Sequence, residues 1–365
     1  MIVGVPKEIK VHESRVAITP EGVSEFVSAG HMVIIEDGAG VGSAILNDDF
    51  IAAGARIVND SEGVWSSSDL ILKVKEPIEA EYLKMRQGQT LFTYLHLAAS
   101  RPCTDALIAS KTTAIAYETV EVNGALPLLS PMSEVAGRLA TQVGASVLQR
   151  PNGGRGVLLG GVPGVAPAHV VVIGGGTAGL NAAIMAIGLG ADVTILDRSI
   201  SRLQHIDAAY NGRIKTLISS PHAIEREVRI ADLVIGAVLV HGAKAPKLIS
   251  NALVKTMKQG SVLVDIAIDQ GGCFEDSRPT THAEPTFAVH GSVFYCVANM
   301  PGAVPVTSTY ALTNATLPYA LSIANNGWKL ACEKDSNLAK GLNVHNGQIY
   351  YEAVAQAHGY DYVKF

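Results

Sequence analysis

The sequence predicts an α/β protein that contains parallel sheets and folds as two domains. Three features of the chain support this fold class. Short apolar runs typical of buried strands alternate with segments of helical periodicity. One such run, starting near His169, leads into closely spaced glycines and then into a helix. The 365 residues are also sufficient for two domains of ordinary size, each with its own core.

The glycine-containing stretch is the clearest signal in the chain. The apolar run Val170–Ile173 predicts a strand buried on both faces. Gly174, Gly176 and Gly179 follow it with GxGxxG spacing. In such loops the first glycine permits a tight turn, the second lets a pyrophosphate approach the backbone, and the third lets the next helix pack close to the strand. That helix, predicted over Ala178–Leu189, points unpaired N–H groups at the phosphates.

A second strand, Asp192–Leu196, leads to Asp197 about 20 residues after the glycines. At this position a carboxylate accepts hydrogen bonds from ribose hydroxyls and repels a 2′-phosphate, so the sequence predicts NAD rather than NADP. Arg198 is the one residue against this choice, since an arginine beside the acid can serve an NADP site. The alternative is a glycine-rich turn in an ordinary α/β sheet, with an acid that merely ends a strand.

Composition argues against several classes of function. The formal net charge of −5 and the lack of any block of like charges argue against nucleic-acid binding. The cysteines are too scattered for a zinc or redox motif. The amino-terminal residues MIVGVPKEIK place charges where a secretory signal needs an apolar core. We therefore expect a reduced, cytoplasmic protein.

One stretch could be mistaken for a membrane span. No charged residue lies between Arg155 and Asp192. The strand, the glycines and the short helix within this stretch argue instead for a buried nucleotide fold. We expect no membrane association.

The amino-terminal third repeats the strand and helix pattern without the glycine motif. Thr19 is predicted to cap a helix whose first turn holds Pro20 and Glu21 and which Gly30 ends. A second short helix is predicted over Asp48–Ala53. The predicted parallel strands of this region are Ile2–Val5, Met32–Ile35, Asp69–Val74, Thr90–Leu95 and Thr113–Tyr117.

Two segments are predicted to connect the domains. They are the helix Ser133–Gln149, with Ser133 as its cap, and the segment MPGAVPVTS that follows Asn299. The elements predicted between and after them are the strands Leu233–Ala237 and Val262–Ile266 and the helices Leu248–Met257 and Thr309–Asn325. We predict two Rossmann-like domains: a discontinuous substrate domain of residues 1–130 and 305–365, and an inserted NAD-binding domain of residues 131–304.

Polar side chains follow two of the predicted strands of the first domain. Lys75 comes just after Asp69–Val74, and His96 just after Thr90–Leu95. Ligands of open α/β sheets bind outside the carboxyl ends of strands, so these residues suggest a site. Such residues also follow strands simply because the chain returns to solvent.

Several motifs together resemble the alanine dehydrogenase family, over nearly the whole chain. They are GVPKEIK, RVAITPEGV (Arg15–Val23), KVKEP (Lys73–Pro77), YLHLA (Tyr94–Ala98), PMSEVAGRLA (Pro131–Ala140), the glycine loop, VDIAIDQGG (Val264–Gly272), RPTTH (Arg278–His282) and YCVANMPGAVPVTSTYALTNAT (Tyr295–Thr316). The resemblance implies reversible, NAD-linked oxidative deamination of L-alanine to pyruvate and ammonium. It also implies a cytoplasmic homohexamer active in amino-acid catabolism.

The resemblance also assigns roles to individual residues. It implies that Arg15 and Lys75 bind the substrate and that His96 is the acid/base group, with Asp269 as its catalytic companion. It implies that NAD contacts Ser133, Gly174, Gly176, Thr177, Ala178, Gly179, Asp197, Arg202, Ser219, Val238, Leu239, Ile266, Ala267, Ile268, Asp269, Arg278, Val297, Ala298, Asn299 and Met300. Ser322 and Asn326 stand where some relatives carry a Glu and a His suited to magnesium, so we predict no metal there.

These residue types suit the implied chemistry. An arginine fork can grip a carboxylate, and a lysine supplies a compact positive charge, so Arg15 and Lys75 could orient Cα. The imidazole of His96 can take and return protons near neutral pH, and Asp269 could stabilise cationic species. Each also has an ordinary structural interpretation. Arg15 could pair with Glu13, Lys75 could be a solvated strand end, His96 could be a buried imidazole, and Asp269 could cap a turn.

Two other functions fit the same features. The nucleotide-binding subunit of proton-translocating transhydrogenase resembles this family over both domains and passes hydride to a second nucleotide. A non-catalytic NAD-binding protein could also retain the fold. His96 and Lys75 together favour the amino-acid dehydrogenase.

Overall fold

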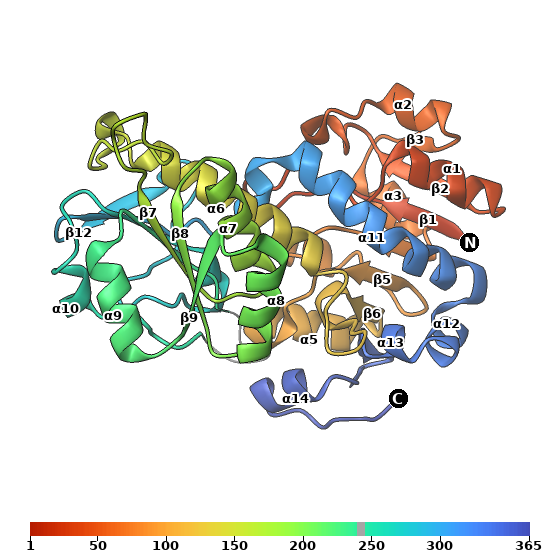
Figure 1. Cartoon of the computed structure of the whole chain (residues 1–365). Coiled ribbons are helices and arrows are strands. Elements are labelled where there is room, and N and C mark those ends of the chain that lie inside the picture. The colour runs from red at the N-terminus through yellow and green to blue at the C-terminus, as the bar shows by residue number, and fades with distance from the viewer. Residues whose placement is uncertain (239–244) are drawn as a thin grey trace. The chain divides into compact units, whose positions relative to one another are not determined.

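The structure is a computed structural model that describes residues 1–238 and 245–365 (Figure 1). The described part of the chain divides into two compact units, Met1–Met132 with Val304–Phe365, and Ser133–Ala303. The predicted fold class is confirmed, since both units are built on mostly parallel sheets. The assignment of substrate binding to one unit and NAD binding to the other stays a prediction.

The first unit has a sheet with the strand order β15-β14-β6-β5-β4-β1-β2-β3. Neighbours from β6 to β3 run parallel, whereas β14 and β15 are antiparallel additions at one edge. The strands are β1 (Ile2–Val5), β2 (Met32–Glu36), β3 (Arg56–Val58), β4 (Leu70–Leu72), β5 (Thr90–Thr93), β6 (Thr113–Ala116), β14 (Leu342–His345) and β15 (Gln348–Ile349). The helices are α1 (Pro20–Ser28), α2 (Asn47–Ala52), α3 (Ser61–Ser67), α4 (Glu79–Tyr82), α5 (Arg101–Ser110), α11 (Pro305–Asn326), α12 (Trp328–Lys334), α13 (Ser336–Ala339) and α14 (Glu352–His358).

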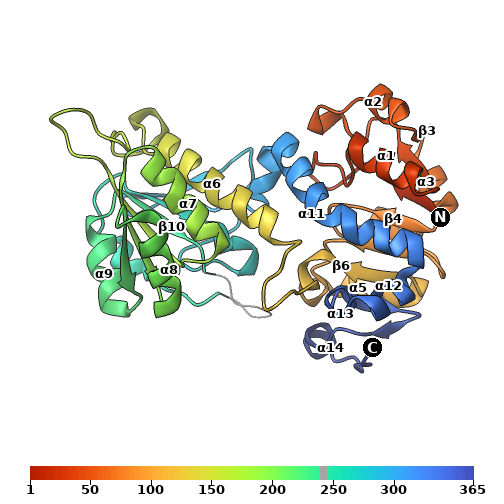
Figure 2. The ribbon, with the colours of Figure 1, turned by 45° about the vertical axis from the view of Figure 1, so that its right-hand side comes forward.

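The second unit has a sheet with the order β12-β13-β11-β10-β7-β8-β9, parallel except for β12. The strands are β7 (His169–Ile173), β8 (Asp192–Asp197), β9 (Ile214–Ile218), β10 (Leu233–Gly236), β11 (Val262–Asp265), β12 (Thr286–Val289) and β13 (Ser292–Tyr295). The helices are α6 (Ser130–Val147), α7 (Thr177–Gly188), α8 (Ile200–Tyr210), α9 (Pro221–Ile230) and α10 (Asn251–Val254). Figures 1 and 2 show α6, α7 and α8 on one side of this sheet and α9 on the other.

Each unit has its own apolar core. In the first, Trp65, Leu91 and Leu107 are buried between the sheet and the helices. In the second, Val171 and Phe294 belong to a cluster that the sheet shares with α9. Burial of apolar side chains on both faces explains why the central strands read as unbroken apolar runs in the sequence.

Local signals predicted several element boundaries. Helix α1 begins at Pro20, and the Thr19 hydroxyl accepts a hydrogen bond from the Gly22 N–H, as predicted. The predicted start of α6 was wrong, because this helix begins at Ser130 and Ser133 lies inside it rather than capping it. Pro131 does not precede the helix but occupies its first turn, where a missing N–H costs nothing.

The helix predicted over Leu248–Met257 is also largely wrong. Helix α10 covers only Asn251–Val254. The preceding residues are extended, because the Leu248 N–H donates to the Cys273 carbonyl at 2.7 Å and Ile249 forms a bridge with Phe274. Pairing with a distant segment thus overrides the local helical pattern.

Helix hydropathy and the state of the cysteines complete the description of the fold. In residues 1–238 and 245–365, no helix combines the length and hydropathy needed to cross a bilayer. All cysteines are free and buried, and burial raises the pKa of the Cys103, Cys296 and Cys332 thiols to about 12.

Candidate active site

The glycine loop lies between β7 and α7 and meets the steric demands predicted for it. Gly174 has a φ of +105°, and a Cβ there would lie 2.6 Å from the Ala237 carbonyl oxygen. A Cβ on Gly179 would lie 1.8 Å from the Gly174 carbonyl oxygen, so only glycine lets α7 pack this close. Around Gly176 the space is open. A phosphate could therefore approach the backbone at Gly176 and the first N–H groups of α7, which includes Thr177 and Ala178.

Asp197, the last residue of β8, is tied to this loop. Its Oδ2 accepts a hydrogen bond from the Gly175 N–H at 2.7 Å, and its Oδ1 accepts one from the Ser199 N–H at 2.8 Å. The Arg202 Nε–H donates to the Gly175 carbonyl at 2.5 Å. A carboxylate has about four acceptor positions, so Asp197 keeps capacity for ribose hydroxyls. The geometry fits the adenosine side of a bound NAD.

Other predicted cofactor residues follow the carboxyl ends of neighbouring strands. Ser219 follows β9, Val238 follows β10, Ile266–Asp269 lie in a 3₁₀ helix after β11, and Val297–Met300 follow β13. Because these strands are parallel, the residues gather at the edge of the sheet that carries the glycine loop. Leu239 lies outside the described residues.

Two predicted contacts come from elsewhere in the second unit. Ser133 lies one turn before Gly137 on α6, and a Cβ on Gly137 would lie 2.1 Å from the Ala178 carbonyl oxygen, so α6 packs against the start of α7. Arg278 is exposed and places its guanidinium 4.4 Å from the centre of the Phe287 ring.

Asp269 is exposed within the 3₁₀ helix Ile266–Gln270. The side chain that caps this helix is Asp265, whose Oδ1 accepts from the Ala267 N–H at 3.0 Å. Asp265 is buried, and burial raises its pKa above the ordinary value. The turn is therefore held by Asp265, which leaves the Asp269 carboxylate at the surface of the unit.

In the first unit, Arg15 and Glu13 form a buried pair. The Arg15 Nε lies 2.6 Å from the Glu13 Oε1, and its Nη2 bonds the second carboxylate oxygen. Its Nη1 lies 3.0 Å from the Met132 sulfur. Burial opposes the charge of Arg15, but Glu13 keeps its pKa above the ordinary value. The interpretation of Arg15 as a partner of Glu13 is thus correct.

Two lysines after β4 have different environments. Lys73 is only 1% exposed, and its Nζ lies 3.1 Å from the Glu8 Oε2 and 2.9 Å from the Glu81 Oε1. Glu8 Oε1 also accepts from the N–H groups of Val74 at 2.6 Å and Lys75 at 3.3 Å. Lys75 is half-buried. The buried lysine is therefore part of an internal ion cluster, and that cluster anchors the backbone that presents Lys75.

His96 follows β5 and is not a buried imidazole. Its side chain is 46% exposed, and its backbone is left-handed, with φ of 48° and ψ of 38°. The ring stacks on Tyr94 at a centroid distance of 5.8 Å. The Glu118 Oε1 accepts from the His96 N–H at 2.5 Å and lies 3.7 Å from its Nδ1.

Sequence reasoning did not select Glu8, Glu118 or Asp265. Each acts on residues that are distant in sequence or on backbone N–H groups, which no local pattern marks. An acid at the carboxyl end of a predicted strand could have marked Glu118 and Asp265, since ligand sites gather at that edge.

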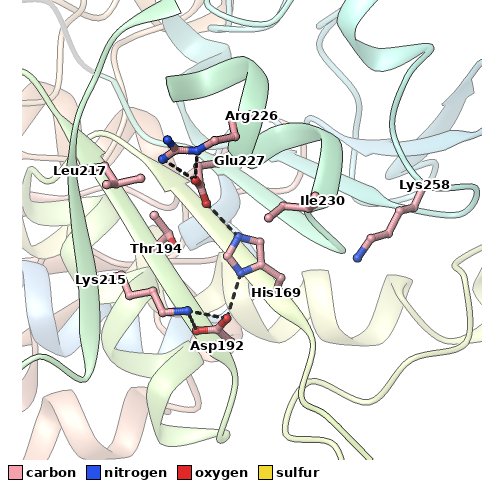
Figure 3. A pocket seen from close by; sticks show the side chains of 9 residues that line it. All are labelled: His169, Asp192, Thr194, Lys215, Leu217, Arg226, Glu227, Ile230 and Lys258. Carbon is pink, nitrogen blue, oxygen red and sulfur yellow. Dashed lines mark hydrogen bonds and ion pairs between the residues drawn. The ribbon is translucent and has the colours of Figure 1, made fainter. Parts of the chain in front are cut away.

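A pocket of about 540 Å³ lies at the opposite edge of the second sheet (Figure 3). Its centre is His169, the first residue of β7, whose ring nitrogens lie 3.3 Å from carboxylate oxygens of Asp192 and Glu227. Those acids also pair with Lys215 and Arg226. These ion pairs join acids and bases, and the pocket is lined at the start of β7, whereas the glycine loop follows the other end of that strand. The pocket is not the nucleotide site.

The segment compared with a magnesium site lies at the end of α11. The Asn326 amide donates to the Ser322 carbonyl at 2.9 Å and accepts from the Lys334 ammonium at 2.7 Å. Among the described residues, no group of three or more His, Cys, Asp or Glu side chains could hold a metal ion.

Comparisons with known proteins cover nearly the whole chain. Residues 4–136 match the family model "Alanine dehydrogenase/PNT, N-terminal domain", and residues 140–352 match its C-terminal domain. An alanine dehydrogenase of Mycolicibacterium smegmatis is 67% identical over 98% of this chain and 96% of its own. A solved L-alanine dehydrogenase is 52% identical, covers 98% of this chain and 99% of its own, and has a TM-score of 0.95. A transhydrogenase from Sinorhizobium meliloti is 24% identical, covers 97% and 100%, and has a TM-score of 0.83, which shows a shared fold alone.

Proposed function

The chain belongs to the alanine dehydrogenase/PNT family, and we propose that it catalyses the reversible oxidative deamination of L-alanine to pyruvate and ammonium with NAD. The observation that carries this proposal is the 67% identity over 98% of the chain to a protein named alanine dehydrogenase. The transhydrogenase is far less similar in sequence. The amino-acid dehydrogenase is therefore the better-supported function.

NAD supplies the acceptor for the hydride that leaves Cα of the substrate. The glycine loop supports this cofactor, since Gly176 leaves open space beside the first N–H groups of α7. Asp197 would bind the ribose and reject a 2′-phosphate. Arg202 holds the loop through the Gly175 carbonyl. The remaining predicted contacts would follow the same edge of the sheet.

Arg15 and Lys75 bind the substrate carboxylate in this proposal. Glu13 fixes the guanidinium plane, and Nη1 lies 3.0 Å from the Met132 sulfur. A guanidinium has five N–H donors, and a substrate carboxylate would accept charge-assisted hydrogen bonds from them. Lys75 adds a second positive charge from a backbone that Glu8 anchors.

His96 carries the proton chemistry, and Asp269 stabilises positive charge on the substrate. Loss of hydride from Cα leaves an iminium, and water must attack that carbon. The His96 imidazole takes the proton from the attacking water and returns it to the departing amine when the carbinolamine collapses. The Asp269 carboxylate favours the cationic iminium.

The same proposal includes a homohexamer that works in the cytoplasm in amino-acid catabolism. It includes no metal at Ser322 and Asn326, and no nucleic-acid or membrane partner. An apolar hairpin of the second unit supports association, since Leu158, Val162 and Val165 are 67%, 54% and 63% exposed. Analytical ultracentrifugation tests the oligomer. A purely monomeric chain would contradict this part of the proposal.

A substrate panel followed by NADH absorbance tests the reaction. We expect NADH formation with L-alanine and NAD, and NADH consumption with pyruvate and ammonium. The rates with glycine, L-serine and 2-aminobutyrate measure the selectivity of the site for L-alanine. NAD binding without turnover on any amino acid would favour a non-catalytic protein. Hydride exchange between two nucleotides without alanine would favour a transhydrogenase.

A further inference from the structure

Glu118 lies beside His96 because the two residues follow the carboxyl ends of neighbouring parallel strands. Strands β5 and β6 are parallel neighbours, with Thr93 paired to Ala116. His96 lies three residues beyond Thr93, and Glu118 lies two residues beyond Ala116. Both side chains therefore emerge at the same carboxyl edge, where ligand-binding groups of such sheets gather.

The Glu118 carboxylate fixes the backbone of His96. Its Oε1 accepts from the His96 N–H at 2.5 Å and from the Leu95 N–H at 3.1 Å, and its Oε2 lies 3.2 Å from the same Leu95 nitrogen. His96 has the left-handed conformation that L-residues seldom adopt. The carboxylate thus holds the N–H groups of Leu95 and His96 at the point where the backbone enters this conformation.

The same carboxylate faces one nitrogen of the imidazole. The Glu118 Oε1 lies 3.7 Å from the His96 Nδ1, a distance that can shorten when substrate binds. Glu118 is only 13% exposed, and among the described residues His96 is the one ionisable cation within ion-pair distance of it. Tyr94 restrains the plane of the His96 ring, since the two rings are stacked at an interplanar angle of 7°. The Tyr94 hydroxyl donates to the Leu128 carbonyl at 2.6 Å, which holds the tyrosine in place.

We propose that Glu118 is a positioning residue that acts through His96, which rests on the proposed function. A carboxylate beside Nδ1 selects the tautomer that carries its proton on Nδ1. Nε2 is then the free base that removes a proton from the attacking water, and the carboxylate stabilises the imidazolium that results. A buried acid orients a catalytic histidine in serine proteases in the same way.

The Glu118→Gln variant separates the effect of Glu118 on the His96 imidazole from its effect on the backbone. The glutamine carbonyl oxygen can still accept both backbone N–H groups, while the negative charge beside Nδ1 is lost. We expect kcat for L-alanine oxidation to fall by roughly 10- to 10³-fold with KM for L-alanine unchanged. Glu118→Asp should recover part of kcat. Glu121→Gln is the matched control, since Glu121 lies three residues on and pairs with Lys340 at 2.8 Å. It should keep the original kcat.

A double variant tests whether Glu118 acts through His96. In the His96→Ala background, Glu118→Gln should lower kcat no further, because the group that it positions is gone. A full multiplicative loss in the double variant would overturn the proposal. So would a Glu118→Gln variant with the original kcat, or one that changes only KM and thermal stability.

Reaction with diethyl pyrocarbonate gives a readout that needs no turnover. This reagent modifies neutral imidazole, and peptide mapping by mass spectrometry measures each histidine separately. Loss of the carboxylate beside Nδ1 should change the rate at which His96 reacts in Glu118→Gln, with exposed His205 as the internal reference. A changed rate in a protein without alanine-dependent NADH formation would overturn the proposed function alone. An unchanged reaction in an active enzyme would overturn the role of Glu118 alone.

Discussion

The guanidinium of Arg15 is held by both carboxylate oxygens of Glu13, two residues earlier, with Nε 2.6 Å from Oε1. The two side chains are 2% and 0% exposed. A buried ion pair loses much of its Coulomb gain to desolvation, but removal of one partner leaves an uncompensated charge. Glu13 is thus essential to any role of Arg15.

Glu13→Gln should destabilise the protein by about 3 kcal/mol or more at neutral pH. Burial by itself raises the pKa of Glu13, but the hydrogen bond and charge of Arg15 outweigh it and lower the pKa below the usual 4.5. The pair therefore stabilises the fold fully above pH 4.5 and loses its contribution as pH falls through the lower, folded-state pKa.

Urea unfolding of both proteins at pH 7 and pH 4 measures this effect. The difference between the original protein and Glu13→Gln should be smaller at pH 4. Glu121→Gln, in a half-exposed pair with Lys340, should change the free energy of unfolding by less than about 1 kcal/mol. Equal effects of the two substitutions at pH 7 would contradict the prediction.

His96→Ala should lower kcat by about 10²- to 10⁴-fold, the usual contribution of a positioned acid/base group. NADH affinity, measured by fluorescence titration, should stay the same, because His96 is not among the predicted cofactor contacts. His205→Ala, at an exposed position on α8, is the control. Full activity of His96→Ala when chemistry limits the rate would rule out the acid/base role.

Asp197→Asn should weaken discrimination against NADP by roughly tenfold or more, because a charge-assisted hydrogen bond is worth about 1.5–3 kcal/mol. Asparagine can still accept one of the two backbone hydrogen bonds of Asp197. The test compares kcat/KM for NAD and NADP. Asp192→Asn, at the other end of β8, should leave the preference unchanged. An unchanged preference in Asp197→Asn would refute the ribose contact.

Two glycines of α7 should respond to alanine in opposite ways. In Gly179→Ala the new Cβ would lie 1.8 Å from the Gly174 carbonyl oxygen, so the loop must move. We expect a loss of about 1–3 kcal/mol in stability and weaker NADH binding. Gly188 is exposed with open space around it, and Gly188→Ala should stabilise the helix by about 0.5–1 kcal/mol. Thermal unfolding and NADH titration check both, and equal melting shifts would contradict the steric argument.

The sequence predicted the elements whose causes are local. Thr19 caps α1 because its hydroxyl reaches an N–H three residues later, and the glycine loop is one continuous motif. The resemblance to the alanine dehydrogenase family is confirmed by the family model and by the relatives. The failed helix at Leu248 has a non-local cause, since its N–H pairs with Cys273.

The candidate site shows the same limit. Position at strand ends pointed to Lys75 and His96, but nothing in the sequence pairs Glu8 with the N–H groups of Val74 and Lys75, which lie 66 and 67 residues away. Likewise Glu118 meets His96 only because β5 and β6 are neighbours in the sheet. The roles of these residues in catalysis stay predictions until the variants are measured.

The rate at which the buried thiols react can measure local unfolding of the protein. Their raised pKa values and burial should leave them almost unreactive toward maleimides in the folded state, so storage without reductant should be harmless. Cys103 and Cys332 lie in one unit, and Cys273 and Cys296 in the other. The rate of maleimide reaction at each cysteine, measured by peptide mapping, would thus report local unfolding of each unit separately. No cysteine needs to be introduced for this measurement.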